Sequence, residues 1–179
     1  MIAPTSDTIE NPVTHDRITF RVTAQNSNAA RLEFDDFLLA GYISPPEHVH
    51  PLQQERFEVI SGSLAVQIAG REQILRVGEI VIVPPGAPHT IRNAGADEAQ
   101  VRVEFAPALQ TEAFLRSMFA LARDGKTDSQ GRPSLLQFAA GASQFGMYVT
   151  NPPVILQKIL FAVLGPLARA LGCRAFYGT

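Results

Sequence analysis

Three of the four histidines in the chain fall within residues 41–93, together with a glutamate that follows two of them closely. His48 and His50 are separated by one residue, so on a β-strand both imidazoles point to the same face. Glu55 follows five residues later, and His89 comes from a separate segment. Three neutral imidazoles and one carboxylate form a ligand set for a divalent transition metal such as iron, manganese, nickel, copper, cobalt or zinc.

Other charged residues near this cluster have the opposite parity along the expected strands. Glu58 alternates away from Glu55, so we expect it to point outward or toward a neighbouring strand. Arg56 and Arg92 also alternate away from the ligands, and a solvated or interface role fits them better than substrate binding. No other acid or histidine is clearly predicted to face inward, so the sequence identifies no separate general base, and either a metal-bound hydroxide or Glu55 itself could serve.

Short segments of alternating apolar and polar residues surround the cluster and predict β-strands. Glycine and proline separate these segments every six to ten residues, which is typical of an antiparallel sandwich or barrel. We expect strands within residues 16–24, 48–50, 56–60, 64–68, 73–77, 80–83, 90–93 and 99–105, and either two short strands or one bent strand within residues 32–42.

After Pro107 the apolar period changes from two residues to three and four, which predicts helices. We expect the first over residues 111–122, a second from a cap at Ser134 to about residue 144, and a third that opens after 151–153 and is kinked at 165–166. These segments carry no ligand cluster, so packing on the barrel or on a second subunit is their expected role.

The chain divides on this basis into a loose N-terminal arm (1–15), a barrel (16–107) and a helical C-terminal extension (108–179). The net charge of −2 and the scattered basic residues predict no nucleic-acid partner and no anionic membrane partner. One apolar stretch, residues 154–171, is near the shortest length that spans a bilayer, but Lys158, Arg169 and a Gly-Pro pair interrupt it. The single cysteine, Cys173, fits a cytoplasmic location.

The first block of residues resembles the first motif of the cupin superfamily, in which a glycine precedes two histidines, a glutamate and a second glycine. His48 and His50, Glu55 after four intervening residues, and Gly62 after six more match this motif. Gly41 lies one residue further upstream than the usual spacing, which affects a loop and leaves the ligands in place.

The second cupin motif fits without a gap. Gly78 is followed after five residues by Pro84-Pro85-Gly86, then after two by His89 and after three by Asn93. Several defined positions at defined spacings in two blocks make this resemblance more specific than a lone pair of histidines. It covers roughly residues 18–105 and does not extend to the helical segment.

The resemblance implies a mainly all-β fold, an antiparallel jelly-roll barrel, with about three α-helices after it. It also implies that His48, His50, Glu55 and His89 hold one metal ion inside the barrel, most often iron. Four protein ligands around an octahedral ion leave two positions for water, dioxygen or a substrate, which suits a mononuclear non-haem oxygenase.

Three alternatives stay open at this point. The cluster can be metal-free; the barrel can bind or sense a small ligand without turnover; or the protein can be a metal-dependent isomerase or lyase. In each case the expected partner is a small molecule. We also expect a homodimer, with an interface among apolar residues of the helical segment, namely Phe114, Phe119, Leu156, Ile159, Leu160 and Leu164.

Overall fold

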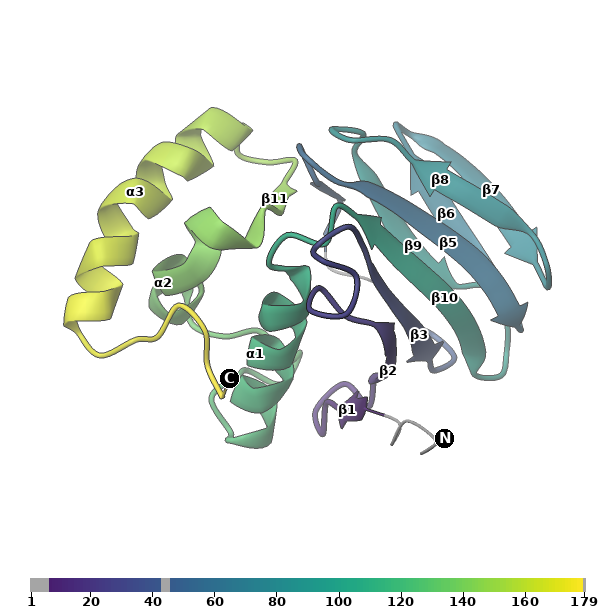
Figure 1. Cartoon of the computed structure of the whole chain (residues 1–179), viewed down its shortest axis with the longest axis horizontal. Helices are drawn as coiled ribbons and strands as arrows, with labels where there is room; N and C mark the ends of the chain where they lie inside the picture. Colours follow the sequence, from purple (N-terminus) through teal and green to yellow (C-terminus); the bar gives the residue numbers. More distant parts are fainter. Residues whose placement is uncertain (1–6, 43–45, 179) are drawn as a thin grey trace.

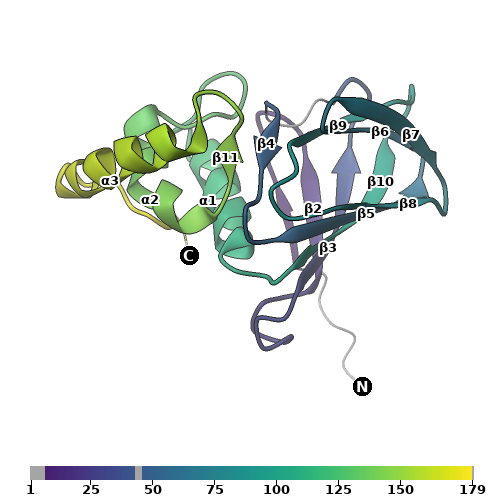
Figure 2. The ribbon, with the colours of Figure 1, turned by 90° about the horizontal axis from the view of Figure 1, so that it is seen from above.

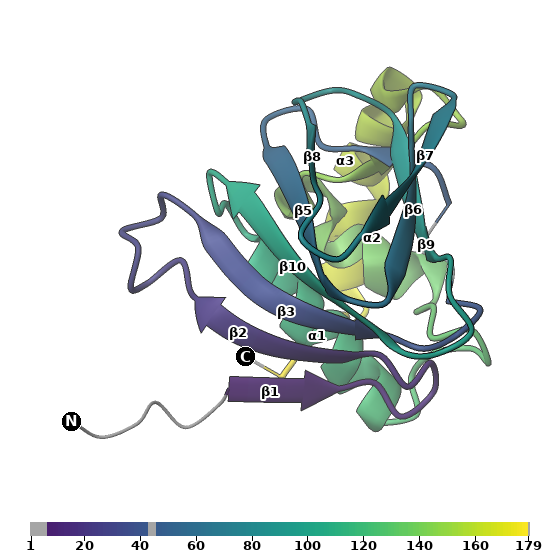
Figure 3. The ribbon, with the colours of Figure 1, turned by 90° about the vertical axis from the view of Figure 1, so that its right-hand side faces the viewer.

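The computed structural model describes residues 7–42 and 46–178. Two antiparallel β-sheets face each other at one end of the molecule, and three helices lie together at the other (Figure 1). Figure 3 shows β5 and β8 of one sheet opposite β6 and β7 of the other. This is the jelly-roll arrangement expected from the sequence, with two sheets in place of one closed barrel, and the three C-terminal helices are present as expected.

The larger sheet has six strands and the smaller has five. In spatial order the first contains β1 (Asp7–Glu10), β2 (Arg17–Val22), β3 (Leu32–Leu38), β10 (Ala99–Ala106), β5 (Gln54–Ser61) and β8 (Ile80–Val83). The second contains β11 (Tyr148–Val149), β4 (His48–Val49), β9 (His89–Asn93), β6 (Ser63–Ile68) and β7 (Arg71–Arg76).

The core lies between the sheets and follows from strand alternation. Along β10 every second residue is buried, beginning at Ala99 and ending at Phe105. The same period in β5 buries Phe57 and Val59 and leaves the residues between them partly exposed. Side chains of one parity therefore fill the interior, and the alternation of the sequence decides which groups can reach a site there.

The helices are α1 (Thr111–Arg123), α2 (Leu135–Phe145) and α3 (Val154–Ala170). Ser134 caps α2 as expected, because its hydroxyl accepts a hydrogen bond from the backbone N–H of Gln137. Figure 1 shows α3 packed along α2 at the edge of the molecule farthest from the strands. No helix among residues 7–42 and 46–178 is long and apolar enough to cross a membrane.

The N-terminal segment differs from the loose arm expected for residues 1–15. Residues 7–10 form β1 and pair in antiparallel register with β2, where Thr8 and Thr19 lie opposite each other with hydroxyl oxygens 2.9 Å apart. Tertiary pairing orders a segment that is too short and polar to show a strand period by itself. Residues 1–6 of the expected arm lie outside the described part of the chain.

The helical segment also differs from the expectation in two respects. It contributes a strand, β11, to the smaller sheet beside β4. Three of the side chains expected at a subunit interface are used within the subunit. Phe119 is buried in the main core, the ring of Phe114 packs on Phe145 with centroids 4.7 Å apart, and Leu164 packs against a small core between α2 and α3. Amphipathic spacing identified these residues as apolar contacts but could not tell which surface covers them.

Candidate metal centre

Three of the four candidate ligands lie on three different strands, and the fourth directly follows one of these strands. His48 lies on β4 directly opposite His89 on β9, and His50 follows the end of the short strand β4. Glu55 comes from β5 in the other sheet. One ligand atom from each of the four lies within 4.8 Å of all the others, and all four side chains are buried. The sequence spacing and the fold thus bring together the residues that the sequence indicated.

Backbone carbonyls orient two of the imidazoles. Nδ1 of His48 lies 3.2 Å from the carbonyl oxygen of Pro46, and Nδ1 of His89 lies 3.0 Å from that of Ala87. A carbonyl can only accept, so each Nδ1 carries the proton and each Nε2 is presented to the cluster. Such carbonyl contacts are the usual outer support of histidines that ligate metals.

Burial keeps His48 and His50 neutral. It lowers the pKa of His48 to about 4, helped by the charge of His89, and lowers the pKa of His50 to about 3, helped by His48 and His89. Neutral imidazole is the form that binds a metal ion. Nδ1 of His50 is itself buried, and no hydrogen-bond partner for it exists in the described part of the chain.

Glu55 and His89 form a buried pair, with Oε2 of the glutamate 2.8 Å from Nε2 of the histidine. Burial raises the pKa of Glu55, although the hydrogen bond and charge of His89 oppose this. Burial alone would lower the pKa of His89. The hydrogen bond to Glu55, the negative charge of Glu55 and the hydrogen bond to the Ala87 carbonyl together raise this pKa. Nε2 of His50 lies 3.6 Å from the same oxygen of Glu55, so that oxygen is shared between two imidazoles.

Apolar side chains and a tight turn hold this cluster. The ring of Phe105 packs on His50 with centroids 5.2 Å apart, and Phe57 lies 6.5 Å from His89. The N–H of Gly86 donates to the carbonyl of His50 at 2.9 Å, which ties the loop before β9 to the end of β4. Gly86 has a φ of +79°, a backbone conformation that favours glycine.

The helical segment supports the cluster from the side of β4. Figure 2 shows β11 between the helices and β4. In this pairing Val149 lies opposite His48, and Tyr148 opposite Val49. The side-chain amide of Gln157 on α3 donates to the carbonyl of Val149 at 2.7 Å. The segment therefore reaches the metal-site strand although it supplies no candidate ligand.

One interior carboxyl group was not identified from the sequence. Asp36 on β3 alternates with the core residues Phe34 and Leu38 and lies opposite Val101 on β10. Its pKa is raised well above the ordinary value by burial first, then by the charges of Asp16 and Glu55. The signal in the sequence that could have identified Asp36 is that it has the same strand parity as the apolar residues Phe34 and Leu38.

Asp36 does not join the metal cluster. The register places Glu55 opposite Phe105 and Asp36 opposite Val101, four residues away on β10. This corresponds to roughly 13 Å along the strand. Tyr42 packs against the core, and the charge of Asp36 contributes, after burial, to raising the pKa of its hydroxyl.

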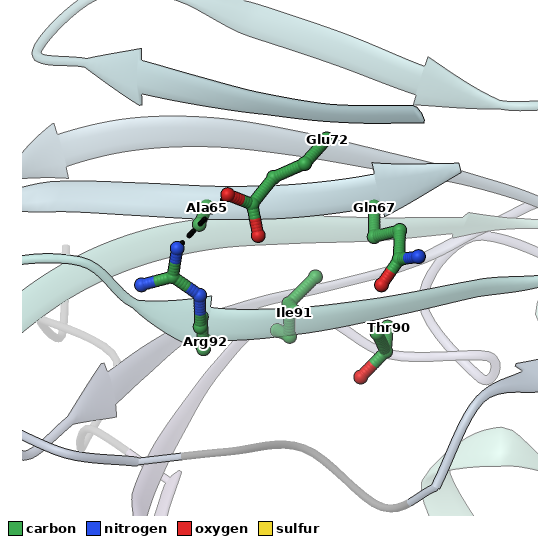
Figure 4. Close-up of a pocket in the computed structure, with 6 residues that line it drawn as sticks. All are labelled: Ala65, Gln67, Glu72, Thr90, Ile91 and Arg92. Atoms are coloured by element: carbon green, nitrogen blue, oxygen red, sulfur yellow. Dashed lines mark hydrogen bonds and ion pairs between the residues drawn. The ribbon is translucent and has the colours of Figure 1, made fainter. Parts of the chain in front are cut away.

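The charged residues of opposite parity lie outside, as the sequence predicts. Glu58 forms an ion pair of 2.8 Å with Arg56, and both side chains are about a quarter exposed. Arg92 pairs with Glu72 at 3.0 Å on the outer face of the smaller sheet (Figure 4). That pair borders a surface pocket lined by Ala65, Gln67, Glu72, Thr90, Ile91 and Arg92.

The residues at the cluster fit a transition-metal ion. Three imidazoles and a carboxylate are the right donor types, they converge from three strands, and two of the imidazoles are oriented by carbonyls. Nδ1 of His50 is buried without a hydrogen-bond partner among the described residues. The His/His/Glu/His cluster could therefore hold a metal ion, whose identity the donor set does not select.

Comparison with known proteins agrees with this site. A family model described as "Cupin domain" matches residues 37–104, which contain all four candidate ligands. The tetracenomycin polyketide synthase protein TcmJ of Streptomyces glaucescens is 36% identical over 64 residues, which are 36% of this chain and 43% of that protein. The chain thus spans less than half the length of that relative.

Two solved structures are similar to part of the chain. An RmlC-like cupin from Shewanella frigidimarina has 18% identity and a TM-score of 0.50, and the match covers 60% of this chain and 89% of that one. The protein TT1209 from Thermus thermophilus has 30% identity and a TM-score of 0.42, and the match covers 45% of this chain and 75% of that one. At 18% identity the first likeness concerns the fold alone.

Proposed function

We propose that this chain, which belongs to the cupin superfamily, binds one divalent transition-metal ion through His48, His50, Glu55 and His89. The observation that carries the proposal is the convergence of these four buried side chains, with one ligand atom of each within 4.8 Å of the others. The depressed pKa values of His48 and His50 support it, because both imidazoles are ready to bind without losing a proton at neutral pH.

We further propose that the protein is a mononuclear non-haem oxygenase that uses iron. A bound iron ion would supply redox chemistry toward dioxygen and Lewis acidity toward substrate oxygens. The apolar side chains near the ligands, Phe57 and Phe105, support a small organic substrate with few polar groups.

Diketones, enediols and phenols are the substrate class that this proposal favours. Each presents adjacent or nearby oxygens and an acidic hydroxyl or enol proton. Either a metal-bound hydroxide or Glu55, by partly leaving the metal, would accept that proton. The partial match to a polyketide synthase protein supports the same class, since polyketides are built from β-dicarbonyl and phenolic units.

Metal analysis of protein purified without an affinity tag tests the metal site. We expect about one transition-metal ion per chain in the wild type and at least a tenfold loss of bound metal in His48→Ala or Glu55→Gln. The matched controls are His15→Ala and Glu58→Gln, which change the same residue types outside the cluster. Metal-free wild-type protein that also takes up no added Fe²⁺, Mn²⁺ or Ni²⁺ would contradict the proposal.

Oxygen uptake separates the oxygenase from the alternatives. The iron-loaded protein is screened with catechols, flavonols, β-diketones and thiols, and uptake should disappear in Glu55→Gln but persist in Glu58→Gln. A ligand that binds with no oxygen uptake and no product would favour a binding or sensor protein. Product formation without oxygen would favour a metal-dependent isomerase or lyase.

We also propose that residues 16–107 act as the metal-binding unit of the chain and residues 108–179 as an extension packed against it. The end of β10 at Ala106 and the start of α1 at Thr111 support a boundary close to Pro107. The pairing of β11 with β4 supports packing on the same subunit. The single cysteine is compatible with the cytoplasm as the place where such a protein works.

A further inference from the structure

One face of α3 presents apolar side chains to solvent along its whole length. Seven large apolar residues of this helix and its C-terminal cap are between 43% and 67% exposed. Figure 1 shows α3 at the outer edge of the molecule, beyond α2. We call this set the α3 stripe; it consists of Ile155, Leu156, Ile159, Leu160, Val163, Leu167 and Leu171.

The opposite face of α3 is already used inside the subunit. Phe161 is buried against Ala139 and Ala142 of α2, and its ring packs edge-on against Phe138 at 5.8 Å. A Cβ on Gly165 would lie 3.0 Å from a backbone oxygen of α2, so the two helices are in close contact there. The rotation of α3 about its axis is therefore fixed by α2, and the α3 stripe cannot turn inward.

The spacing of the α3 stripe fits another helix. Its central residues Leu156, Leu160, Val163 and Leu167 are separated by four, three and four positions. That alternation is the seam of a two-helix contact, in which side chains of one helix insert between those of the other.

The distribution of charge on α3 indicates that the partner surface is itself apolar. The stripe contains no charged residue. The nearest cations are directed back to the protein: Arg169 donates to the carbonyl of Ala140 at 2.8 Å, and Nζ of Lys158 lies 5.5 Å from the ring of Tyr148. A helix that lies on an anionic membrane surface carries a basic polar face, which α3 lacks. A second α3 stripe is apolar, uncharged and of matching spacing.

A second exposed apolar patch exists at the edges of the two sheets, formed by Ile74, Val77, Ile80 and Ile82. Charged residues interrupt it on both sides, because Arg76 and Glu79 lie within the same turn. The α3 stripe is longer and free of such interruptions. It is therefore the surface that observations of this chain favour as a subunit contact.

We propose that α3 packs against α3 of a second copy of this chain about a two-fold axis, so that the same stripe covers itself. An isologous contact of this kind needs one self-complementary patch, which the stripe provides. A helix of 17 residues is about 26 Å long. The seven side chains of the stripe, each 43–67% exposed, are the apolar surface that α3 would contribute toward the roughly 800 Å² that each partner buries in a standard interface.

Light scattering coupled to gel filtration tests the proposal with the full chain at 10–100 µM, a range that exceeds about micromolar dissociation constants. Wild-type protein should show twice the chain mass of 19.4 kDa. The double variant Leu160→Glu and Val163→Glu should show half that value, since like charges would meet across the axis. The matched control Ile82→Glu adds a charge at a half-exposed apolar site of the other patch and should remain a dimer.

Folding and rival partners are tested with the same samples. Far-UV circular dichroism and Co²⁺ uptake should be equal in the wild type and in the double variant, so that loss of the dimer is not loss of the fold. A monomeric wild type overturns the proposal, as does a dimer that Ile82→Glu breaks and the α3 variant leaves intact. Flotation of a monomeric wild type with phosphatidylcholine and phosphatidylserine vesicles would assign the stripe to a lipid surface instead. These outcomes do not depend on whether the metal centre is an oxygenase.

Discussion

Asp35 and Asp36 are adjacent in the chain, but their side chains lie in different environments. Asp35 is fully buried and accepts hydrogen bonds from Nε of Arg21 and Nε of Arg102, each at 2.9 Å. Burial would raise its pKa, but the two arginines outweigh burial and lower it. Asp36 points between the sheets, where its Oδ1 is buried with no partner among the described residues and its pKa is raised. Strand alternation alone separates these two environments.

The raised pKa of Asp36 predicts a pH-dependent gain of stability in Asp36→Asn. The folded state holds the proton above pH 4 while the unfolded chain has released it, so stability falls as pH rises through this window. Asn cannot ionise, so the variant should be more stable than the wild type at pH 7. This difference in stability should be smaller at pH 4. The gain is about 1.4 kcal/mol for each unit by which the pKa is raised. Urea unfolding of metal-stripped protein at several pH values measures it.

The matched control for that experiment is Asp35→Asn, for which the expected change in stability at pH 7 has the opposite sign. Its folded pKa is lowered, so its stabilising effect is present at neutral pH and is lost as pH falls. Asp35→Asn should therefore destabilise the protein at pH 7. Two variants that shift stability in the same direction at pH 7 would contradict the different environments of these carboxylates.

Residue types and spacing were sufficient to predict the candidate ligands but not the interior carboxyl group. His48, His50, Glu55 and His89 lie in two blocks whose spacing is specific, and the strand parity of Glu55 against Glu58 was correct. Asp36 was not assigned inward, because the residues around it fitted either two short strands or one bent strand, which left its parity open. A buried carboxyl group contradicts the hydrophobic pattern, so the pattern hides it.

At the scale of the elements, the chain passes from the larger sheet to the smaller one through a single residue. β5 ends at Ser61, β6 begins at Ser63, and Gly62 between them has a φ of +77°. A Cβ at this position would lie 2.9 Å from Cα and Cβ of Ala99 on β10. The link thus needs glycine for its backbone angle and for the close approach of a strand.

Gly62→Ala should therefore destabilise the protein more than Gly78→Ala. Gly78 has a φ of +83° but has open space where a Cβ would be added. Both variants lose about 1–2 kcal/mol for the left-handed backbone. Gly62→Ala should lose about 1–3 kcal/mol more, because the new methyl group displaces β10. The free energy of unfolding in urea gives both values, and equal losses would show that the approach of Ala99 has no energetic weight.

Most elements could be predicted because their period or their end signals are strong. The nine strands from β2 to β10 and the three helices lie close to the expected segments, and Ser134 caps α2. β1 and β11 could not be predicted. Each contains only four or two residues, which is too few for a period, and each is ordered by the strand beside it. Short strands added by tertiary contact leave little signal in the sequence.

At the scale of the whole molecule, the helical segment and the metal-site strands form one connected structure. β11 pairs with β4, and the loop after β4 reaches the start of α1 through Gln53. Gln53 is 1% exposed, and the two hydrogens of its Nε2 are shared among three acceptors: the carbonyl oxygens of Pro107 and Ala108 at 2.9 and 3.1 Å and Oγ1 of Thr111 at 2.8 Å. Three acceptors around the junction between the two parts thus depend on one amide group.

Gln53→Leu should weaken both the fold and the metal site. Leucine has a similar volume but cannot donate, so buried acceptors lose their partner at a cost of about 1–3 kcal/mol in unfolding free energy. Because Gln53 is two residues before Glu55, we expect Co²⁺ affinity to fall by about tenfold, the lower end of what support around metal ligands contributes. Gln54→Leu, at a less buried neighbour, is the control and should change both quantities less. Lower stability with unchanged Co²⁺ affinity would mean that the extension stabilises the barrel without positioning its ligands.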